Sequence, residues 1–379
     1  MFLLEHHGKE LLARRGLPVP PGVWIAAPSA LQRGALPDGP WTVKAQTASG
    51  GRGKAGAIRH AATVADIERI TASLEGGRVA GKPIHGFRVE RRIEGAHEAY
   101  LSLSIDPAAC RIRLLVADDG GIEVETRAPH AILADPDKVA DAAREAAGKV
   151  APQLQAAIRD AATRLGALFL ACDAELLEVN PLFVQPDGSW FAGDLKLVID
   201  ENAIPRQEEV AALLRAHPEM YPESARKLAH GFDYVELDPD GEIGLITTGA
   251  GLSMKLIDEL LAQGRRPLNF CDIRTGQFRG DPARLIAAMR WIAARASVRV
   301  VLVNVFAGIT DLGEFARLFV EAAKAVPELR APVVARLIGR NLEDARRILA
   351  ASGLDIAIEP DLDRALRLAL AALPGNARG

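Results

Sequence analysis

The chain has 379 residues, of which 49% are hydrophobic and 25% are charged, and its net charge is −3. This length predicts two or three domains, and the composition is typical of an ordinary soluble globular protein. The near-neutral charge excludes a basic surface that recruits nucleic acid. No uncharged apolar stretch of about 18 residues occurs, which excludes a membrane-spanning helix.

The cysteines and the first residues predict a cytoplasmic protein. Three cysteines stand far apart without a CxxC pair, which is typical of reduced thiols and not of a disulfide framework or a zinc site. The first twenty residues hold no apolar signal-peptide core, because polar side chains interrupt them: His6, His7, Lys9, Glu10, Arg14 and Arg15.

The first half of the chain predicts an α+β lobe built on antiparallel sheet. An amphipathic helix pattern over residues 2–15 ends at Gly16, and a proline-rich connector follows it. Residues 41–46 predict a strand, and residues 64–75 predict a helix that begins after Thr63. Three β-type runs, one helical stretch and a hairpin around Pro186-Asp187-Gly188 follow: residues 87–93, 99–105 and 111–117, then about 136–168, then 176–184 and 190–199.

The second half, after a helix and linker over residues 206–231, alternates between strand-like and helical runs. The strand-like runs are residues 242–248, 266–272, 298–305, 332–338 and 354–358. The helical runs are residues 251–264, 281–296, 312–325, 341–352 and 361–373. Such alternation predicts a parallel sheet with helices on both faces. Its ligands are expected at the carboxyl ends of the strands, in the loops of residues 247–251, 272–276 and 306–310.

The most specific feature is a lysine followed by a glycine-rich loop. Lys44 lies in the predicted strand of residues 41–46, and residues 49–56 contain four glycines and two more cations. A lysine in an apolar strand is costly unless an anion meets it, and glycine lets a backbone approach a polyphosphate. We therefore interpret Lys44 as a clamp on a nucleotide phosphate. The alternative is a lysine that snorkels from an edge strand.

Oxygen ligands for Mg²⁺ occur later in the chain. Glu178 and Asn180 are two apart on a predicted strand and point to one face, and Asp194 lies on the return strand of the same hairpin. Mg²⁺ takes a few oxygens from protein and the rest from phosphate and water, which suits Asn180 and Asp194. Glu178 is either a third group beside the metal or an orienter of a catalytic partner. For Asn180 alone, a plain Asn-Pro turn is the alternative.

Other polar groups allow two interpretations each. Glu90 and Glu98 flank a strand break, either as solvated side chains or as partners of a ribose or base. The loops of residues 306–310 and 247–251 each open a helix whose N-terminus favours an anion, or they are plain turns. The eight histidines show no HExxH or similar spacing and no GxSxG occurs, so no nucleophilic triad is predicted.

Together these features resemble the β subunit family of ADP-forming succinyl-CoA synthetase, including its malate–CoA ligase relatives. The resemblance covers nearly the whole chain and rests on residues 9–14, 43–46, 50–56, 178–182, 249–254, 269–272 and 302–309. It implies an α/β fold with an ATP-grasp domain over residues 1–230, which includes a small subdomain around 20–95. A flavodoxin-like CoA-ligase domain, with a doubly wound parallel sheet, is implied over residues 231–379.

The resemblance also implies roles for individual residues. It implies ATP or ADP binding by Lys44, Gly51, Arg52, Gly53, Glu90, Ile93 and Glu98, and Mg²⁺ binding by Asn180 and Asp194. It implies that Glu178 orients a phosphohistidine and that the carboxylic acid is held by Thr248, Gly308, Ile309 and Thr310. The family's phosphorylated histidine and most of its CoA contacts lie on a separate α subunit, so a partner chain is expected.

Several residues near the expected acid site depart from the family pattern. Thr248 stands where asparagine is usual, Arg274-Thr275-Gly276 replaces a triple-glycine turn, Asp311 replaces an arginine, and Ala307 resembles the malate–CoA ligase relatives. Asp311 should repel a second carboxylate unless a cation or a hydroxyl donor compensates. We expect a catalytic subunit that acts on succinate or a related dicarboxylate. The alternatives are a ligase for malate or another acid, and a non-catalytic regulatory paralogue.

Overall fold

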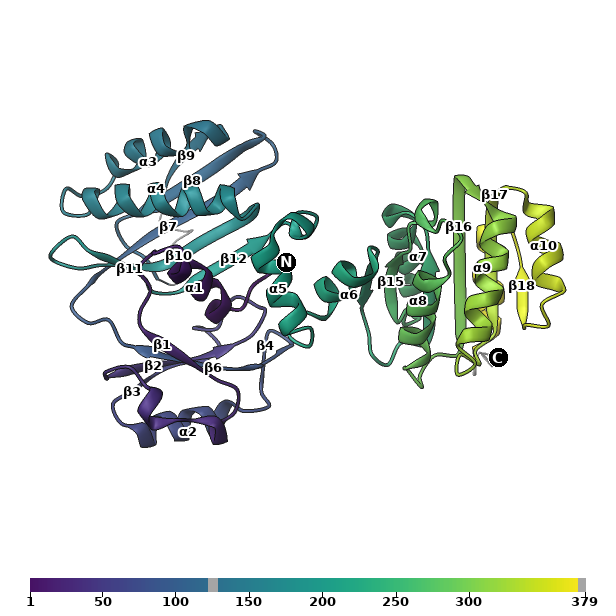
Figure 1. Ribbon diagram of the computed structural model, residues 1–379, viewed down its shortest axis with the longest axis horizontal. Helices are drawn as coiled ribbons and strands as arrows, with labels where there is room; N and C mark the ends of the chain where they lie inside the picture. Colours follow the sequence, from purple (N-terminus) through teal and green to yellow (C-terminus); the bar gives the residue numbers. More distant parts are fainter. Residues whose placement is uncertain (122–128, 374–379) are drawn as a thin grey trace. The chain divides into compact units, whose positions relative to one another are not determined.

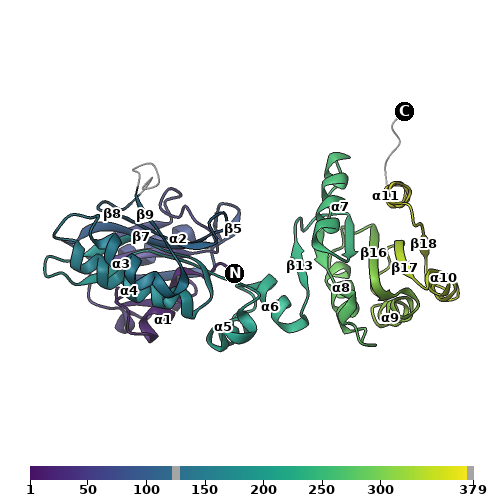
Figure 2. The same cartoon turned by 90° about the horizontal axis from the view of Figure 1, so that it is seen from above.

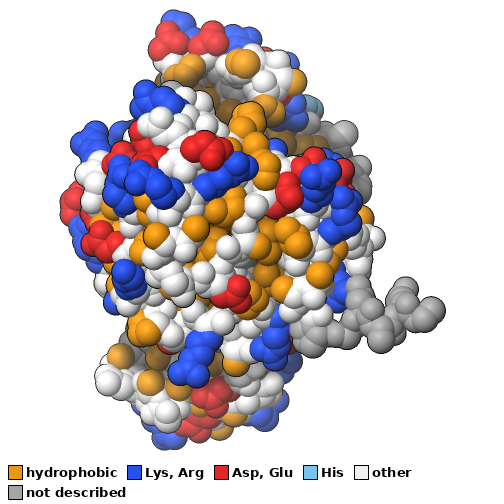
Figure 3. All heavy atoms as spheres, turned by 90° about the vertical axis from the view of Figure 1, so that its right-hand side faces the viewer, with side chains coloured by type: hydrophobic (Ala, Val, Ile, Leu, Met, Phe, Trp, Pro, Cys, Tyr) orange, Lys and Arg blue, Asp and Glu red, His pale blue; other side chains and the backbone are white. Residues whose placement is uncertain are grey.

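The structure is a computed structural model that describes residues 1–121 and 129–373. The chain folds as two compact units, Met1–Val210 and Ala211–Gly379 (Figure 1). Within the described ranges, no helix combines the length and the apolar character needed to cross a bilayer. On the face shown in Figure 3, Lys and Arg side chains alternate with Asp and Glu side chains, in keeping with the small net charge.

The first unit contains a four-stranded antiparallel sheet that carries Lys44. Its strand order is β1 (Gly22–Ile25), β6 (Gly86–Arg91), β2 (Trp41–Gln46) and β3 (Ile58–Ala61). Val43 and Ala45 face a core that includes Ile67 of helix α2 (Val64–Leu74), so alternation turns Lys44 to the other face of the sheet. Thr63 caps α2 in a capping box with Asp66, which confirms the predicted helix start. The short hairpin of β4 (Arg78–Val79) and β5 (Lys82–Pro83) follows α2.

A second, larger antiparallel sheet completes the first unit. Its order is β11 (Trp190–Ala192), β10 (Ala174–Val184), β7 (His97–Asp106), β8 (Arg111–Ala117) and β9 (His130–Ala134), and β12 (Leu195–Ile199) also pairs with β10. Helices α3 (Val139–Ala147) and α4 (Gln155–Ala171) pack together on this sheet (Figure 1). The prediction of one helical stretch over 136–168 is wrong at its centre, where Gly148 and Pro152 lie between the two helices.

Helix α1 (Glu5–Arg14) lies between the two sheets of the first unit (Figure 1). Gly8 faces β12 so closely that a Cβ atom would lie 2.9 Å from Leu195 Cδ2. On the other side, Glu5 and Lys9 contact residues of β2 and β6. The predicted helix is confirmed, but its buried side carries two charged residues that a globular core does not normally accept unpaired.

The hairpin predicted over residues 176–199 is interrupted on its return side. β11 ends at Ala192 and β12 begins at Leu195, so Gly193 and Asp194 form a break in the edge of the large sheet. A Cβ atom on Gly193 would lie 2.4 Å from Phe183 Cε2 and 2.7 Å from Pro181 O. Only glycine fits this close approach, and the break directs the Gly193 carbonyl and the Asp194 side chain inward.

The second unit is built on a parallel sheet with helices on both faces, as predicted. Its strand order is β14 (Ile243–Thr247), β16 (Val300–Asp311), β17 (Val333–Arg340) and β18 (Ile356–Ile358). Val301 and Val303 pack toward α8 (Ala283–Ala293), α9 (Leu312–Ala325) and α10 (Leu342–Ala350). Val300 and Leu302 pack toward α7 (Ala250–Ala262) and α11 (Leu362–Ala371), so the helices form two layers (Figure 2). Helices α5 (Glu208–Ala216) and α6 (Pro222–His230) precede this sheet in the sequence.

One predicted strand lies outside the parallel sheet. β15 (Asn269–Asp272) pairs antiparallel with β13 (Asp233–Glu236) in a separate two-stranded sheet. The Asn269 side chain accepts from Leu245 N (2.9 Å) and donates to Leu245 O (2.8 Å). This amide bonds Leu245 where backbone ladder bonds would otherwise lie, and backbone bonds to β14 remain only on either side, from Leu268 N to Ile243 O (2.8 Å) and from Ile273 N to Thr247 O (2.9 Å). β16 also continues to Asp311, beyond the predicted end at residue 305.

Candidate active site

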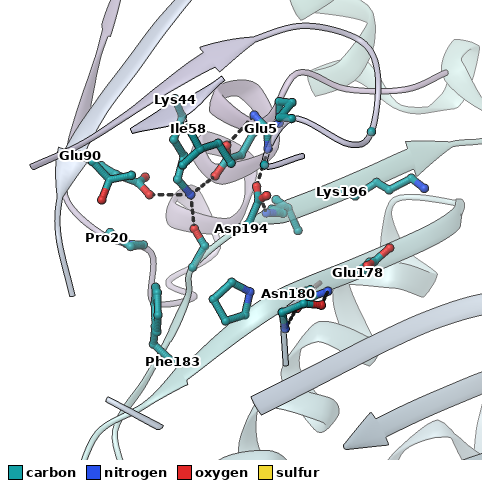
Figure 4. A pocket seen from close by; sticks show the side chains of 18 of the residues that line it. Glu5, Pro20, Lys44, Ile58, Glu90, Glu178, Asn180, Phe183, Asp194 and Lys196 are labelled. Atoms are coloured by element: carbon teal, nitrogen blue, oxygen red, sulfur yellow. Dashed lines mark hydrogen bonds and ion pairs between the residues drawn. The ribbon is translucent and has the colours of Figure 1, made fainter. Parts of the chain in front are cut away.

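A cavity of about 620 Å³ lies in the first unit beside the glycine-rich loop, β2, β10 and the Gly193-Asp194 break (Figure 4). This volume is in the range of small-molecule sites. The cavity is lined by every residue for which nucleotide, metal or phosphohistidine contact was predicted: Lys44, Gly51, Arg52, Gly53, Glu90, Ile93, Glu98, Glu178, Asn180 and Asp194. Glu178 and Asn180 thus share one face of β10, as their spacing predicts.

Lys44 is 5% exposed and its ammonium group is fully engaged. Nζ lies 2.8 Å from Glu5 Oε1, 2.9 Å from Glu90 Oε1 and 2.5 Å from Gly193 O (Figure 4). Burial alone lowers the pKa of Lys44, but the carboxylates of Glu5, Glu90 and Asp194 outweigh it and raise that pKa. Lys44 is therefore a charged lysine held at the cavity wall, and not a lysine that snorkels to solvent.

Glu5 is a member of this site that the sequence pattern did not reveal. It is 3% exposed, and its carboxylate lies 2.7 Å from Lys9 Nζ, 2.8 Å from Lys44 Nζ and 2.7 Å from Arg52 Nη1. Burial raises the pKa of Glu5, but these three cations outweigh it and hold that pKa well below its usual range. The available signal was the spacing of Glu5 and Lys9 on the same helical stripe as Leu12.

Glu90 is held in a similar way by cations behind the cavity. Its Oε2 lies 2.8 Å from Lys9 Nζ and 2.6 Å from Arg88 Nε. Arg88 also donates to His6 Nδ1 (3.0 Å) and to Pro20 O (2.8 Å). The network has four cations and three carboxylates, so it carries one excess positive charge: Lys9, Lys44, Arg52 and Arg88 against Glu5, Glu90 and Asp194.

Arg52 connects the glycine-rich loop to the predicted metal ligand Asp194. Its guanidinium contacts Glu5 and also pairs with Asp194. Gly51, just before it, has a φ of +76°, a conformation that glycine adopts without strain. The loop can therefore turn back and place a cation beside the carboxylate for which metal binding is predicted.

The predicted metal ligands lie next to each other. Asn180 N donates to Asp194 O (3.1 Å), and the Asn180 side chain accepts from Gly121 N (2.6 Å) and donates to Gly121 O (3.1 Å). Among the described residues, no cluster of three His, Cys, Asp or Glu side chains could enclose a metal. Two protein oxygens in an open cavity fit Mg²⁺, because it keeps water and phosphate oxygens as its other ligands.

A threonine between β2 and the glycine-rich loop has an unmet hydrogen-bonding group. Thr47 lines the cavity and is 2% exposed, and its Oγ1 has no hydrogen-bond partner in the described part of the chain. Buried hydroxyls are normally paired. An unpaired one at a cavity wall is expected where a ligand supplies the missing partner.

The residues predicted to hold the acid lie in the second unit, at the ends of β14 and β16. Thr248 Oγ1 accepts from Phe306 N (3.2 Å), and Thr310 Oγ1 lies 2.8 Å from Thr275 Oγ1. Gly308 has open space where a Cβ atom would lie. The side chain of Ile309 lies outside the described part of the structure.

Asp311 takes up the N-terminus of α9. Its Oδ1 accepts from Gly313 N (2.9 Å) and Glu314 N (3.1 Å), and its Oδ2 accepts from Asn341 Nδ2 (2.6 Å). These donors hold the pKa of Asp311 below its usual value. The negative charge of Asp311 therefore caps the helix.

Two families match the chain, one after the other. The ATP-grasp domain family matches residues 2–184 and the CoA-ligase family matches residues 246–370. ATP citrate lyase from Methanothrix soehngenii, in complex with citrate and coenzyme A, shares the fold with a TM-score of 0.75 at 17% identity over 98% of this chain and 99% of that one. An ATP-grasp domain followed by a CoA-ligase domain defines an acid–thiol ligase, and the predicted fold class is confirmed.

Similar sequences narrow this class to one family. The chain is 36% identical over 367 residues to the β subunit of ADP-forming succinate–CoA ligase from Chloroflexus aurantiacus. This alignment covers 93% of this chain and 94% of the relative. It is 34% identical over 397 residues to that of Thioalkalivibrio sulfidiphilus, which covers 98% and 100%. The chain belongs to the family of ADP-forming succinate–CoA ligase β subunits, which confirms the resemblance seen in the sequence.

Proposed function

We propose that the chain binds MgATP in the cavity of its first unit and transfers the γ-phosphoryl group to a histidine of a partner α subunit. The observation that carries this proposal is that all the nucleotide, metal and phosphohistidine residues expected from the family line one cavity. The ionic network at and behind the cavity wall carries one excess formal positive charge, which suits a polyphosphate. In the transfer, the bond from the γ-phosphorus to the bridging oxygen breaks, a bond to an imidazole nitrogen forms, and ADP leaves.

The roles follow from position at the cavity. Lys44 and the Gly51-Arg52-Gly53 turn hold the phosphates, while Glu90, Ile93 and Glu98 contact the nucleoside. Asp194 and Asn180 hold Mg²⁺, which neutralises phosphate charge when bound. Glu178, beside Asn180 on β10, orients the phosphohistidine. Catalysis of such a transfer is mostly charge neutralisation and alignment, which a fixed ionic wall provides.

The second unit is proposed to hold the carboxylic acid through Thr248, Gly308, Ile309 and Thr310, with CoA bound mostly by the partner. In this scheme the acid is first phosphorylated and the CoA thiol then displaces phosphate to form the thioester. Succinate or a related dicarboxylate is the first candidate, and a cytoplasmic location accompanies this function. The domain division after residue 230 stays a prediction, since the matched families leave residues 185–245 unassigned.

Malate or another variant acid is the second candidate, and the departures near the acid site favour it. Thr248 already accepts a hydrogen bond from Phe306 N, so its own proton remains available to a carboxylate or hydroxyl of the acid. Asp311 supplies no cation for a second carboxylate. A panel of acids tested with the reconstituted complex decides: a succinate preference of at least tenfold in kcat/KM over all others excludes this candidate (~1.4 kcal/mol).

The experiment for the proposed function follows transfer of labelled γ-phosphate from ATP to the partner chain, with Mg²⁺ present. Lys44→Ala and Asp194→Ala should each lower the transfer rate by about 100-fold or more. Arg69→Ala, an exposed cation on α2, is the matched control and should leave the rate unchanged. Full rates in both site variants would refute the assigned site. Binding of MgADP without turnover of any acid would instead favour the regulatory paralogue.

A further inference from the structure

The ionic network at the cavity is arranged in layers. Its members occupy two positions: Lys44, Arg52, Glu5 and Glu90 line the cavity, whereas Lys9 and Arg88 contact the two carboxylates from behind and do not line it. Both carboxylates contact a lining cation and a cation behind it. Such an arrangement differs from a simple buried ion pair, because each carboxylate also contacts a second cation that does not line the cavity.

Glu5 forms ion pairs with Lys44 and Arg52, the two cations proposed to bind the nucleotide phosphates. The three N–H groups of Lys44 face Glu5, Glu90 and Gly193 O, so a phosphate oxygen reaches this ammonium only if one acceptor withdraws. Arg52 lies 2.7 Å from Glu5 on one side and pairs with Asp194 on the other. A nucleotide phosphate must therefore compete with a carboxylate of the chain itself.

Lys9 makes that exchange possible for Glu5. Lys9 lies one helical turn away on α1, is 0% exposed, and contacts Glu5 Oε1 at 2.7 Å. A buried carboxylate without a partner is strongly unfavourable. Because Lys9 stays in contact, Glu5 can release Lys44 and Arg52 without becoming an unpaired buried charge.

We propose that Glu5 is a positioning residue of the nucleotide site: an exchangeable counterion that holds Lys44 and Arg52 in place and yields them to nucleotide phosphates while Lys9 keeps it paired. This inference rests on the proposed MgATP site. A purely structural alternative is that Glu5 serves only to neutralise the buried Lys9. The proposed role and the structural alternative predict different changes in nucleotide affinity when the charge of Glu5 or of Lys9 is removed.

The test is calorimetric titration of ADP, with Mg²⁺ in excess, into the full-length chain. Glu5→Gln should bind MgADP at least threefold more tightly than wild type, because the competing charge is gone. Lys9→Met should bind at least threefold more weakly, because Glu5 must then retain Lys44 and Arg52 as its partners. A structural role predicts weaker binding, or a smaller binding-competent fraction, in both variants. Unchanged or weaker binding by Glu5→Gln overturns the inference.

The double variant Glu5→Gln/Lys9→Met removes one charge of each sign and should restore binding to at least the wild-type affinity. If a single variant does not fold, the double variant is compared with wild type directly, and weaker binding overturns the inference. Glu10→Gln is the matched control on α1, since the Glu10 side chain is 44% exposed. Failure of wild type to bind MgADP would refute the nucleotide site itself, whereas wild-type binding with the wrong signs refutes only the role of Glu5.

Discussion

At the scale of single residues, the cavity wall is a set of charges whose partners come from distant parts of the chain. Lys44 meets Glu5 across 39 positions and Gly193 across 149. Lys44 stands out in the sequence because a charge in an apolar strand needs an anion, but no local pattern says which anion. Glu5 was missed for the same reason, since a charge near an amphipathic helix start is usually solvated or stabilises the helix N-terminus.

Substitution of Thr47 by valine is expected to raise the free energy of unfolding and to weaken MgADP binding. Its buried hydroxyl is unpaired in the described structure, so Thr47→Val removes a desolvated polar group while keeping the shape of the side chain. We expect the variant to gain about 1 kcal/mol in the free energy of unfolding and to lose about three- to tenfold in affinity for MgADP. Thermal unfolding and calorimetric titration measure the two effects.

Ser49→Ala is the matched control two residues further on, because Ser49 also lines the cavity but its hydroxyl already donates to Val79 O (3.2 Å). Its removal should cost a little stability and leave MgADP affinity within about twofold of wild type. Loss of stability in Thr47→Val, or unchanged affinity, would contradict the role given to the Thr47 hydroxyl.

At the scale of elements, a strand or turn can be predicted from the sequence when neighbouring residues alone determine it. The alternation that places Glu178 and Asn180 on one face, and the turn at Pro186-Asp187-Gly188, are local and were predicted correctly from the sequence. The separation of β15 from the parallel sheet was not predicted, because it involves the Asn269 amide, which bonds Leu245 of a strand distant in the sequence. Hydrophobic pattern alone cannot separate a strand that joins a sheet from one that stops beside it.

The break between β11 and β12 positions the Gly193 carbonyl in the cavity, and a substitution of Gly193 tests this role. Gly193→Ala would place Cβ 2.4 Å from Phe183 and 2.7 Å from the Pro181 carbonyl, so the backbone must shift. That shift moves the carbonyl that accepts from Lys9 and Lys44. We expect a loss of about 1–3 kcal/mol in the free energy of unfolding, together with weaker MgADP binding.

Denaturant unfolding and MgADP titration of Gly193→Ala measure both losses. Gly34→Ala is the matched control, because nothing lies within 4 Å of the position that its Cβ atom would take and its conformation suits any residue. A Gly193→Ala chain with wild-type stability and wild-type binding would show that the break does not organise the cavity.

At the scale of the whole molecule, the charges needed for one nucleotide site set how the chain as a whole responds to pH. Ionised carboxylates of Glu5 and Glu90 pair with the cations of this network, and His6 adjoins it through Arg88. His6 Nδ1 faces Arg88, and because a guanidinium only donates, this nitrogen must accept and carries no proton. His6 also lies near His7 and Glu10, and its ring lies 5.2 Å from that of Trp24.

His6 therefore makes folding sensitive to mild acid. Burial, then the charge of Arg88 and the neighbouring His7, lower the pKa of His6 from 6.5 to about 3. Below pH 6.5, His6 binds a proton in the unfolded chain but stays neutral in the folded chain. The free energy of unfolding therefore falls as the pH falls from 6.5 toward 3. The loss is about 1.4 kcal/mol per pH unit at most, or about 2 kcal/mol between pH 6.5 and 5.

His6→Gln should remove this part of the pH dependence, measured by urea unfolding at pH 6.5 and pH 5, whereas His130→Gln at an exposed position should keep it. An equally steep pH dependence in wild type and His6→Gln would show that His6 is protonated in the folded chain and that Arg88 is not its partner there.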